Sequence, residues 1–121
     1  MARIYPLFSS SKGNSTYIGD EHSGILIDCG VSFKRLSGAL ALNNIPLKAV
    51  QAVFITHEHS DHISGLKMLT KNTGIPVYGQ KRTLQRLCDS DKIAPSSPVI
   101  DMSGTAIACA DSEICCFNTP H

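Results

Sequence analysis

The chain has 121 residues, of which 42% are hydrophobic and 17% charged, so it has the size and composition of one folded domain and not of a disordered or fibrous protein. Eleven lysines and arginines nearly balance ten acidic residues, which excludes a nucleic-acid-binding protein that works by overall charge alone. No stretch approaches the roughly 18 consecutive apolar residues of a membrane span, and no signal peptide is evident. Five cysteines without C-x-x-C spacing indicate reduced thiols, so we expect a cytoplasmic protein.

The first elements predicted are three strands within residues 2–28, joined by a Ser/Gly-rich loop at 9–14 and a turn at 20–24. Ser32 follows as a candidate helix cap. The helix after it has an apolar stripe at helical spacing, formed by Phe33, Leu36 and Leu40.

Strands and helices then alternate along the chain. The patterns predict a buried strand over 50–56, a helix over 63–73, a strand over 75–79, a helix over 83–91 and three short strands between 98 and 119. There is no linker or internal repeat. We therefore predict a single α/β domain over residues 1–121, with a mixed sheet and helices on one face.

Four potential metal ligands lie within six residues between a buried strand and a helix: His57, His59, Asp61 and His62. In an extended loop, side chains two residues apart project to the same side, so His57 and His59 can bind one ion. Asp61 and His62 can then reach a neighbouring ion, about 3.5–4 Å away in known two-metal sites. A solvated polar loop, or a His-rich tract that binds metal adventitiously, is the alternative.

This H-x-H-x-D-H run resembles the signature of the metallo-β-lactamase superfamily. The segments SSSKGNSTYIG, ILIDCG, VFITHEHSDHISGL and PVYG, in this order, are similar to the WalJ/YycJ-like group. The resemblance implies a four-layer αβ/βα sandwich of which residues 1–121 are the N-terminal half. It also implies a cytosolic phosphodiesterase with 5′-to-3′ DNA exonuclease activity. A bridging Asp and a last His would lie beyond residue 121, so we expect the chain alone to be inactive.

The resemblance also implies roles for individual residues. His57 and His59 correspond to ligands of the first ion, and His121, in the run CFNTPH, to its third ligand. Asp61, which we also assign to catalysis, and His62 correspond to ligands of the second ion. Asp28 resembles the acidic residue that orients the ligands from behind; a turn residue at a strand end is the alternative.

Three further features have two readings each. Ser10, Ser11 and Asn14 could bind a phosphate near the metals or form a plain loop. Basic residues outnumber acidic ones between residues 67 and 92, and this local positive charge could steer a polyanion or belong to a solvated surface. The basic residues are Lys67, Lys71, Lys81, Arg82, Arg86 and Lys92. Cys109, Cys115 and Cys116 could join His121 in a structural zinc site. Adjacent cysteines on a strand point to opposite faces, however, which favours the interpretation as buried thiols.

The leading functional hypothesis is therefore a hydrolase with two divalent ions, acting on phosphodiester bonds with a nucleic acid as its expected partner. Zinc suits the nitrogen-rich ligand set, and manganese is possible because carboxylate contributes. A thioester or lactam hydrolase on the same scaffold, or a non-catalytic metal-binding fragment, is the alternative. With helices on one face only, the sheet needs its missing C-terminal half or self-association to cover the other face; no membrane is expected.

Overall fold

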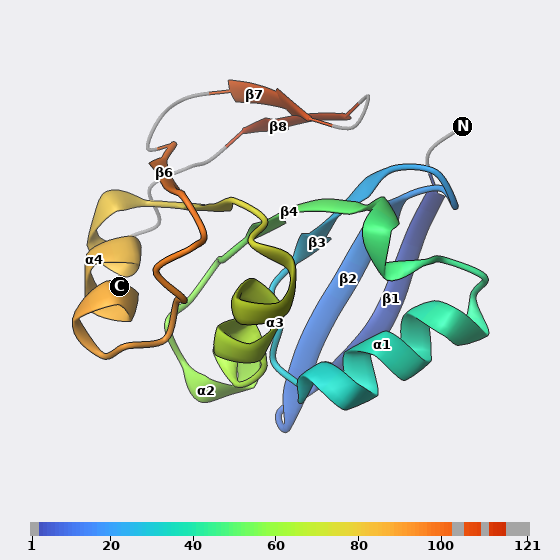
Figure 1. Ribbon diagram of the computed structural model, residues 1–121, viewed down its shortest axis with the longest axis horizontal. Coiled ribbons are helices and arrows are strands. Elements are labelled where there is room, and N and C mark those ends of the chain that lie inside the picture. Colours follow the sequence, from blue (N-terminus) through green and yellow to red (C-terminus); the bar gives the residue numbers. More distant parts are fainter. Residues whose placement is uncertain (1–2, 103–105, 110–111, 116–121) are drawn as a thin grey trace.

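The computed structural model describes residues 3–102 in full and the backbone of residues 106–109 and 112–115 (Figure 1). The strands are β1 Arg3–Ser10, β2 Gly13–Gly19, β3 Gly24–Ile27, β4 Val50–Phe54, β5 Val77–Gly79, β6 Val99–Asp101, β7 Ala106–Cys109 and β8 Ser112–Cys115. The helices are α1 Phe33–Leu42, α2 Ser60–Ile63, α3 Leu66–Thr73 and α4 Lys81–Asp89, with a 3-10 turn at Leu47–Ala49. None of the helices within these described ranges combines the length and apolar character that a membrane crossing requires.

Strands β1 to β6 form one mixed sheet in sequence order. The first three pair antiparallel as a meander, and β3, β4, β5 and β6 run parallel to one another. Helices α1, α3 and α4 connect the parallel strands, as parallel pairing requires. A separate antiparallel hairpin is formed by β7 and β8.

The four helices that the structure describes pack against one face of the sheet, as predicted. Along β4, Val53 belongs to the helix-covered core, whereas Ala52 and Phe54 belong to the opposite face. The helix-covered core packs sheet residues against Leu36, Leu40, Leu66, Leu69, Leu84 and Leu87. The alternation follows from the two-residue period of a strand.

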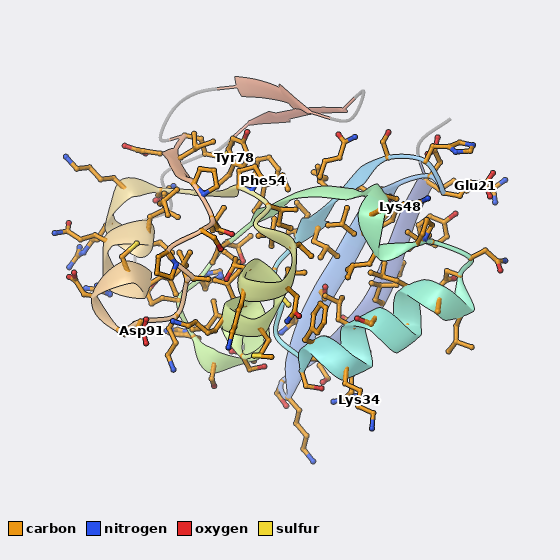
Figure 2. All side chains as sticks on the ribbon, viewed as in Figure 1. Glu21, Lys34, Lys48, Phe54, Tyr78 and Asp91 are labelled. Carbon is orange, nitrogen blue, oxygen red and sulfur yellow. The ribbon has the colours of Figure 1, made fainter. Side chains whose placement is uncertain are left out.

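The second face of the sheet carries an apolar cluster. Ile25, Ala52, Phe54 and Met102 are buried on it, and the rings of Phe54 and Tyr78 stack with centroids 4.6 Å apart (Figure 2). Half-buried side chains of Ile18, Ile27 and Tyr78 surround this cluster.

Two boundaries differ from the prediction, the first for a local reason and the second for a tertiary one. The Ser/Gly-rich loop is only a two-residue turn, because Ser10 pairs with Gly13 and the strands continue to both. The helix expected over 63–73 is instead α2 and α3, separated at Gly65. There the Gly65 amide donates to the Cys29 carbonyl at 2.9 Å, and a Cβ would lie 1.9 Å from the Val31 oxygen.

Two serines of α1 give a matched test of its stability. Ser32 Oγ accepts from the Arg35 amide at 3.2 Å, which confirms it as the N-cap. Ser37 Oγ is buried and has no hydrogen-bond partner among the described residues. We expect Ser32→Ala to lower the free energy of unfolding by about 1 kcal/mol, and Ser37→Ala to leave it unchanged or raise it. Urea unfolding of both variants measures this, and equal losses would contradict it.

Candidate metal centre

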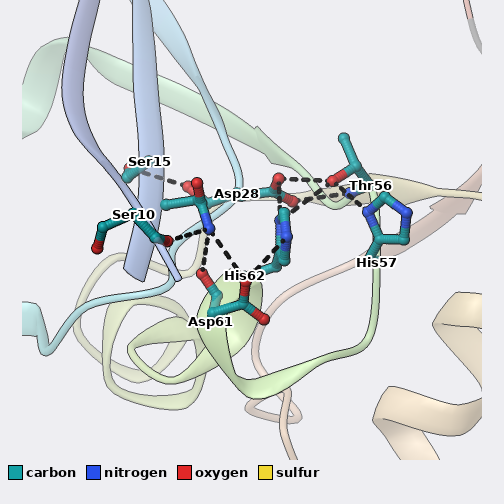
Figure 3. Close-up of polar contacts among 8 residues, drawn as sticks. Ser10, Ser15, Asp28, Thr56, His57, Asp61 and His62 are labelled. Carbon is teal, nitrogen blue, oxygen red and sulfur yellow. Dashed lines mark hydrogen bonds and ion pairs between the residues drawn. The ribbon is translucent and has the colours of Figure 1, made fainter. Parts of the chain in front are cut away.

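Four of the predicted ligands, and the Asp28 predicted to orient them, lie at the carboxyl ends of two neighbouring parallel strands. Asp28 follows β3, and residues 56–62, here named the ligand loop, follow β4 and enter α2. Because β3 and β4 are parallel, both segments emerge at the same edge of the sheet (Figure 3). Ligand sites in open α/β sheets form at this edge.

The Asp28 carboxylate connects both ends of the ligand loop. It is 5% exposed and accepts from the Thr56 amide at 2.7 Å, the Thr56 hydroxyl at 2.6 Å and His62 Nδ1 at 2.6 Å. Its backbone has a φ of 62°, a left-handed conformation that Asp tolerates better than most residues. The plain turn residue that was the alternative would not need these three contacts.

These contacts determine which ring nitrogens of the histidines are already hydrogen-bonded within the protein. Because a carboxylate can only accept, His62 Nδ1 is the donor to Asp28, which leaves Nε2 as the ring nitrogen that could bind a metal; Nε2 lies 3.4 Å from Asp61 Oδ2. The Thr56 hydroxyl donates to Asp28, so it can accept from His57 Nδ1 at 3.1 Å. Thr56 was not among the predicted site residues; only its place directly before the motif could have indicated it.

The three imidazole rings of the loop lie near one another. The ring centroid of His57 is 6.0 Å from that of His59 and 5.0 Å from that of His62. Within the part of the chain that the structure describes, no three His, Cys, Asp or Glu side chains surround a common point. Imidazole nitrogen and carboxylate oxygen nevertheless suit zinc by type. The donor types of the loop therefore fit a divalent ion, and further donors would be required from elsewhere. His121 lies outside the described residues.

The serine-rich hairpin contacts the loop through Asn14. Asn14 Nδ2 lies 3.2 Å from both the main-chain oxygen and Oδ2 of Asp61. Ser10 Oγ accepts from the Lys12 amide at 3.1 Å, and Ser11 is exposed at the turn. The structure therefore brings Asn14 to the candidate site and leaves the hydroxyls of Ser10 and Ser11 at the hairpin tip.

Close backbone packing joins these segments. The Cys29 amide donates to the His62 carbonyl at 2.8 Å, and the Gly30 amide to the Asn14 carbonyl at 2.8 Å. A Cβ on Gly30 would lie 1.8 Å from the Asp61 oxygen, so only glycine permits this approach. The sequence shows the glycine but not the backbone it faces.

Glu58, which lies in the ligand loop between His57 and His59, pairs with Arg86 of α4. This ion pair is the main cause that lowers the pKa of Glu58. Lys67 likewise pairs with Asp91 at 2.5 Å. Arg86 and Lys67 are thus engaged with carboxylates, which favours the solvated-surface interpretation.

The Cys29 thiol is not a catalytic candidate. Burial, and then the charge of Asp28, raises the pKa of Cys29 to about 12, so the reactive thiolate is scarce. The zinc alternative built on Cys109, Cys115, Cys116 and His121 lies outside the described side chains.

Comparison with known proteins identifies the family. A model of the metallo-beta-lactamase superfamily matches residues 11–103. The chain is 34% identical to the exodeoxyribonuclease WalJ of Streptococcus pneumoniae serotype 2 (strain D39) over 118 residues, which cover 95% of this chain and 44% of the relative. It is 36% identical to the exodeoxyribonuclease YycJ of Bacillus anthracis over 77 residues, covering 64% of this chain and 29% of the relative. The chain thus spans less than half the length of these relatives.

Solved structures agree on the fold. BJP-1, a subclass B3 metallo-beta-lactamase of Bradyrhizobium japonicum, matches with a TM-score of 0.78 at 20% identity, over 99% of this chain and 50% of that one. At this identity the likeness concerns the fold alone. The predicted resemblance and fold class are therefore confirmed, and the chain belongs to the metallo-beta-lactamase superfamily, with sequence similarity to its WalJ/YycJ exodeoxyribonucleases.

Proposed function

We propose that the full-length protein is a metal-dependent hydrolase that cleaves phosphodiester bonds in DNA from the 5′ end, in the cytoplasm. The observation that carries the proposal is the ligand loop held by Asp28 at the sheet edge, in a chain similar to two exodeoxyribonucleases. Residues 1–121 would supply this loop. The remaining half would supply the second sheet and further ligands.

The residues divide between two ions, with zinc favoured and manganese possible. His57 and His59, together with His121, would hold the first ion, and Asp61 and His62 the second. Divalent ions supply polarisation of a phosphoryl oxygen and lower the pKa of water toward 7. Within the chain, Asp28 keeps the His62 proton on Nδ1, and Thr56 orients His57. His59 is exposed and His57, Asp61 and His62 are half-buried, so a polymer can reach the loop.

A panel of substrates tests this proposal. We expect the full-length zinc-loaded or manganese-loaded protein to hydrolyse bis-p-nitrophenyl phosphate and to release a 5′ label from DNA before a 3′ label. Thioester and cephalosporin turnover should stay at background, and residues 1–121 alone should show little activity. Turnover confined to the thioester or cephalosporin would replace the proposal with the alternative hydrolases, and no turnover of any substrate with a loaded protein would favour a non-catalytic role.

A further inference from the structure

We infer that Asn14 is a positioning residue for Asp61: its side-chain amide fixes the rotation of the Asp61 carboxylate and leaves Oδ1 as the ligand atom. This rests on the proposed function, in which Asp61 binds the second ion. The inference comes from a contact between residues 47 positions apart, in which Asn14 Nδ2 lies 3.2 Å from Asp61 Oδ2 and 3.2 Å from the Asp61 main-chain oxygen.

Asn14 is itself held on several sides, so its amide can act as a fixed support. It is paired with Ser9 in the hairpin, and its Nδ2 also lies 3.0 Å from the Ser10 carbonyl. Its main-chain oxygen accepts from the Gly30 amide at 2.8 Å. An NH₂ group has two donors, which these three carbonyl and carboxylate oxygens share.

Close packing limits how far Asp61 can move away from this support. A Cβ on Gly30 would lie 1.8 Å from the Asp61 main-chain oxygen and 2.7 Å from the Asn14 nitrogen. The three backbones therefore meet at Gly30 without an intervening side chain. Movement of the Asp61 backbone toward Gly30 is blocked, and the Asn14 amide restrains it from the hairpin side.

The two oxygens of the Asp61 carboxylate therefore differ in their hydrogen-bond partners. Oδ2 receives the Asn14 amide and lies 3.4 Å from His62 Nε2, whereas Oδ1 has no polar contact within the described part of the chain. A carboxylate fixed through one oxygen presents the other in a defined direction, and partners behind metal ligands commonly change affinity in this way. The amide faces Asp61, so this contact gives Asn14 a positioning role and not the direct phosphate contact considered from the sequence.

Metal affinity of the full-length protein tests the inference without reliance on turnover. Asn14→Ala removes the donors, and Asn14→Asp replaces them with acceptors of nearly the same shape. We expect both to weaken binding of one of two zinc equivalents by about 10–100-fold and to leave the other unchanged, as measured by chelator competition and elemental analysis. Melting of the metal-free variants should stay close to that of Ser10→Ala, which alters the same turn without facing Asp61. Asn43→Asp, an exposed position, controls for the added charge.

The outcomes separate this inference from the proposed function. Wild-type affinity in both Asn14 variants, or equal weakening of both equivalents together with lower melting of the metal-free protein, would overturn the positioning role. In the Asp61→Ala background, Asn14→Ala should have no further effect on zinc binding; an additional loss there would also overturn it. A wild-type protein without zinc affinity, or an Asp61→Ala variant that retains both equivalents, would instead refute the proposed function.

Discussion

Asp28→Asn is expected to lower the metal affinity of the full-length protein by about 10–100-fold. The carboxylate accepts three hydrogen bonds from Thr56 and His62 while almost fully buried, and an amide would place a donor against one of these donors. With the amide nitrogen in the Oδ2 position, both the Thr56 hydroxyl and His62 Nδ1 would lose their acceptor; with it in the Oδ1 position, the Thr56 amide would lose its acceptor. Asn also tolerates the left-handed backbone at this position, so the substitution tests the side chain and not the turn.

The same substitution should lower the free energy of unfolding of the metal-free protein by about 2 kcal/mol, because hydrogen bonds to a charged group are worth about 1.5–3 kcal/mol. Isothermal titration with zinc and urea unfolding measure the two effects. Asp89→Asn, an exposed position on α4, removes the same charge and serves as the control. Affinity equal to that of Asp89→Asn would show that Asp28 does not orient the ligands.

Asp61→Ala is expected to remove about one equivalent of metal from the full-length protein and to lower hydrolysis by about 100-fold or more. The fold should persist, because Asn14 keeps its contacts with the Ser10 and Asp61 main-chain oxygens and the Asp61 side chain is 30% exposed. Elemental analysis after dialysis gives the metal content, and circular dichroism monitors the fold. Unchanged metal content would remove Asp61 from the ligand set.

Much of the architecture could be predicted because local rules agree with it. Ser32 caps α1 as its hydroxyl suggests, and the run around Val53 forms a strand buried on both faces. The alternation of strand and helix then leaves few arrangements other than a parallel segment with helices on one face.

The errors arise where backbone from a distant segment intervenes. Nothing near Gly65 signals that Cys29 and Val31 will interrupt the helix there. The spacing of the ligand loop indicated its chemistry, but not that Thr56 connects it to Asp28 or that Asn14 faces Asp61. Such contacts depend on strand order, which no periodicity within a single segment encodes.

The dependence of the ligand loop on Asp28 and Asn14 has a consequence for the order of assembly. A peptide of residues 56–63 would contain all four candidate donors, yet neither the carboxylate that sets the His62 tautomer nor the amide that restrains Asp61. Asp28 and Asn14 reach the ligand loop only after the crossover through α1 has placed β4 beside β3. This is a non-local step, which loop-closure entropy makes slow. The donors are therefore encoded within a few residues, while their arrangement is a property of the completed sheet.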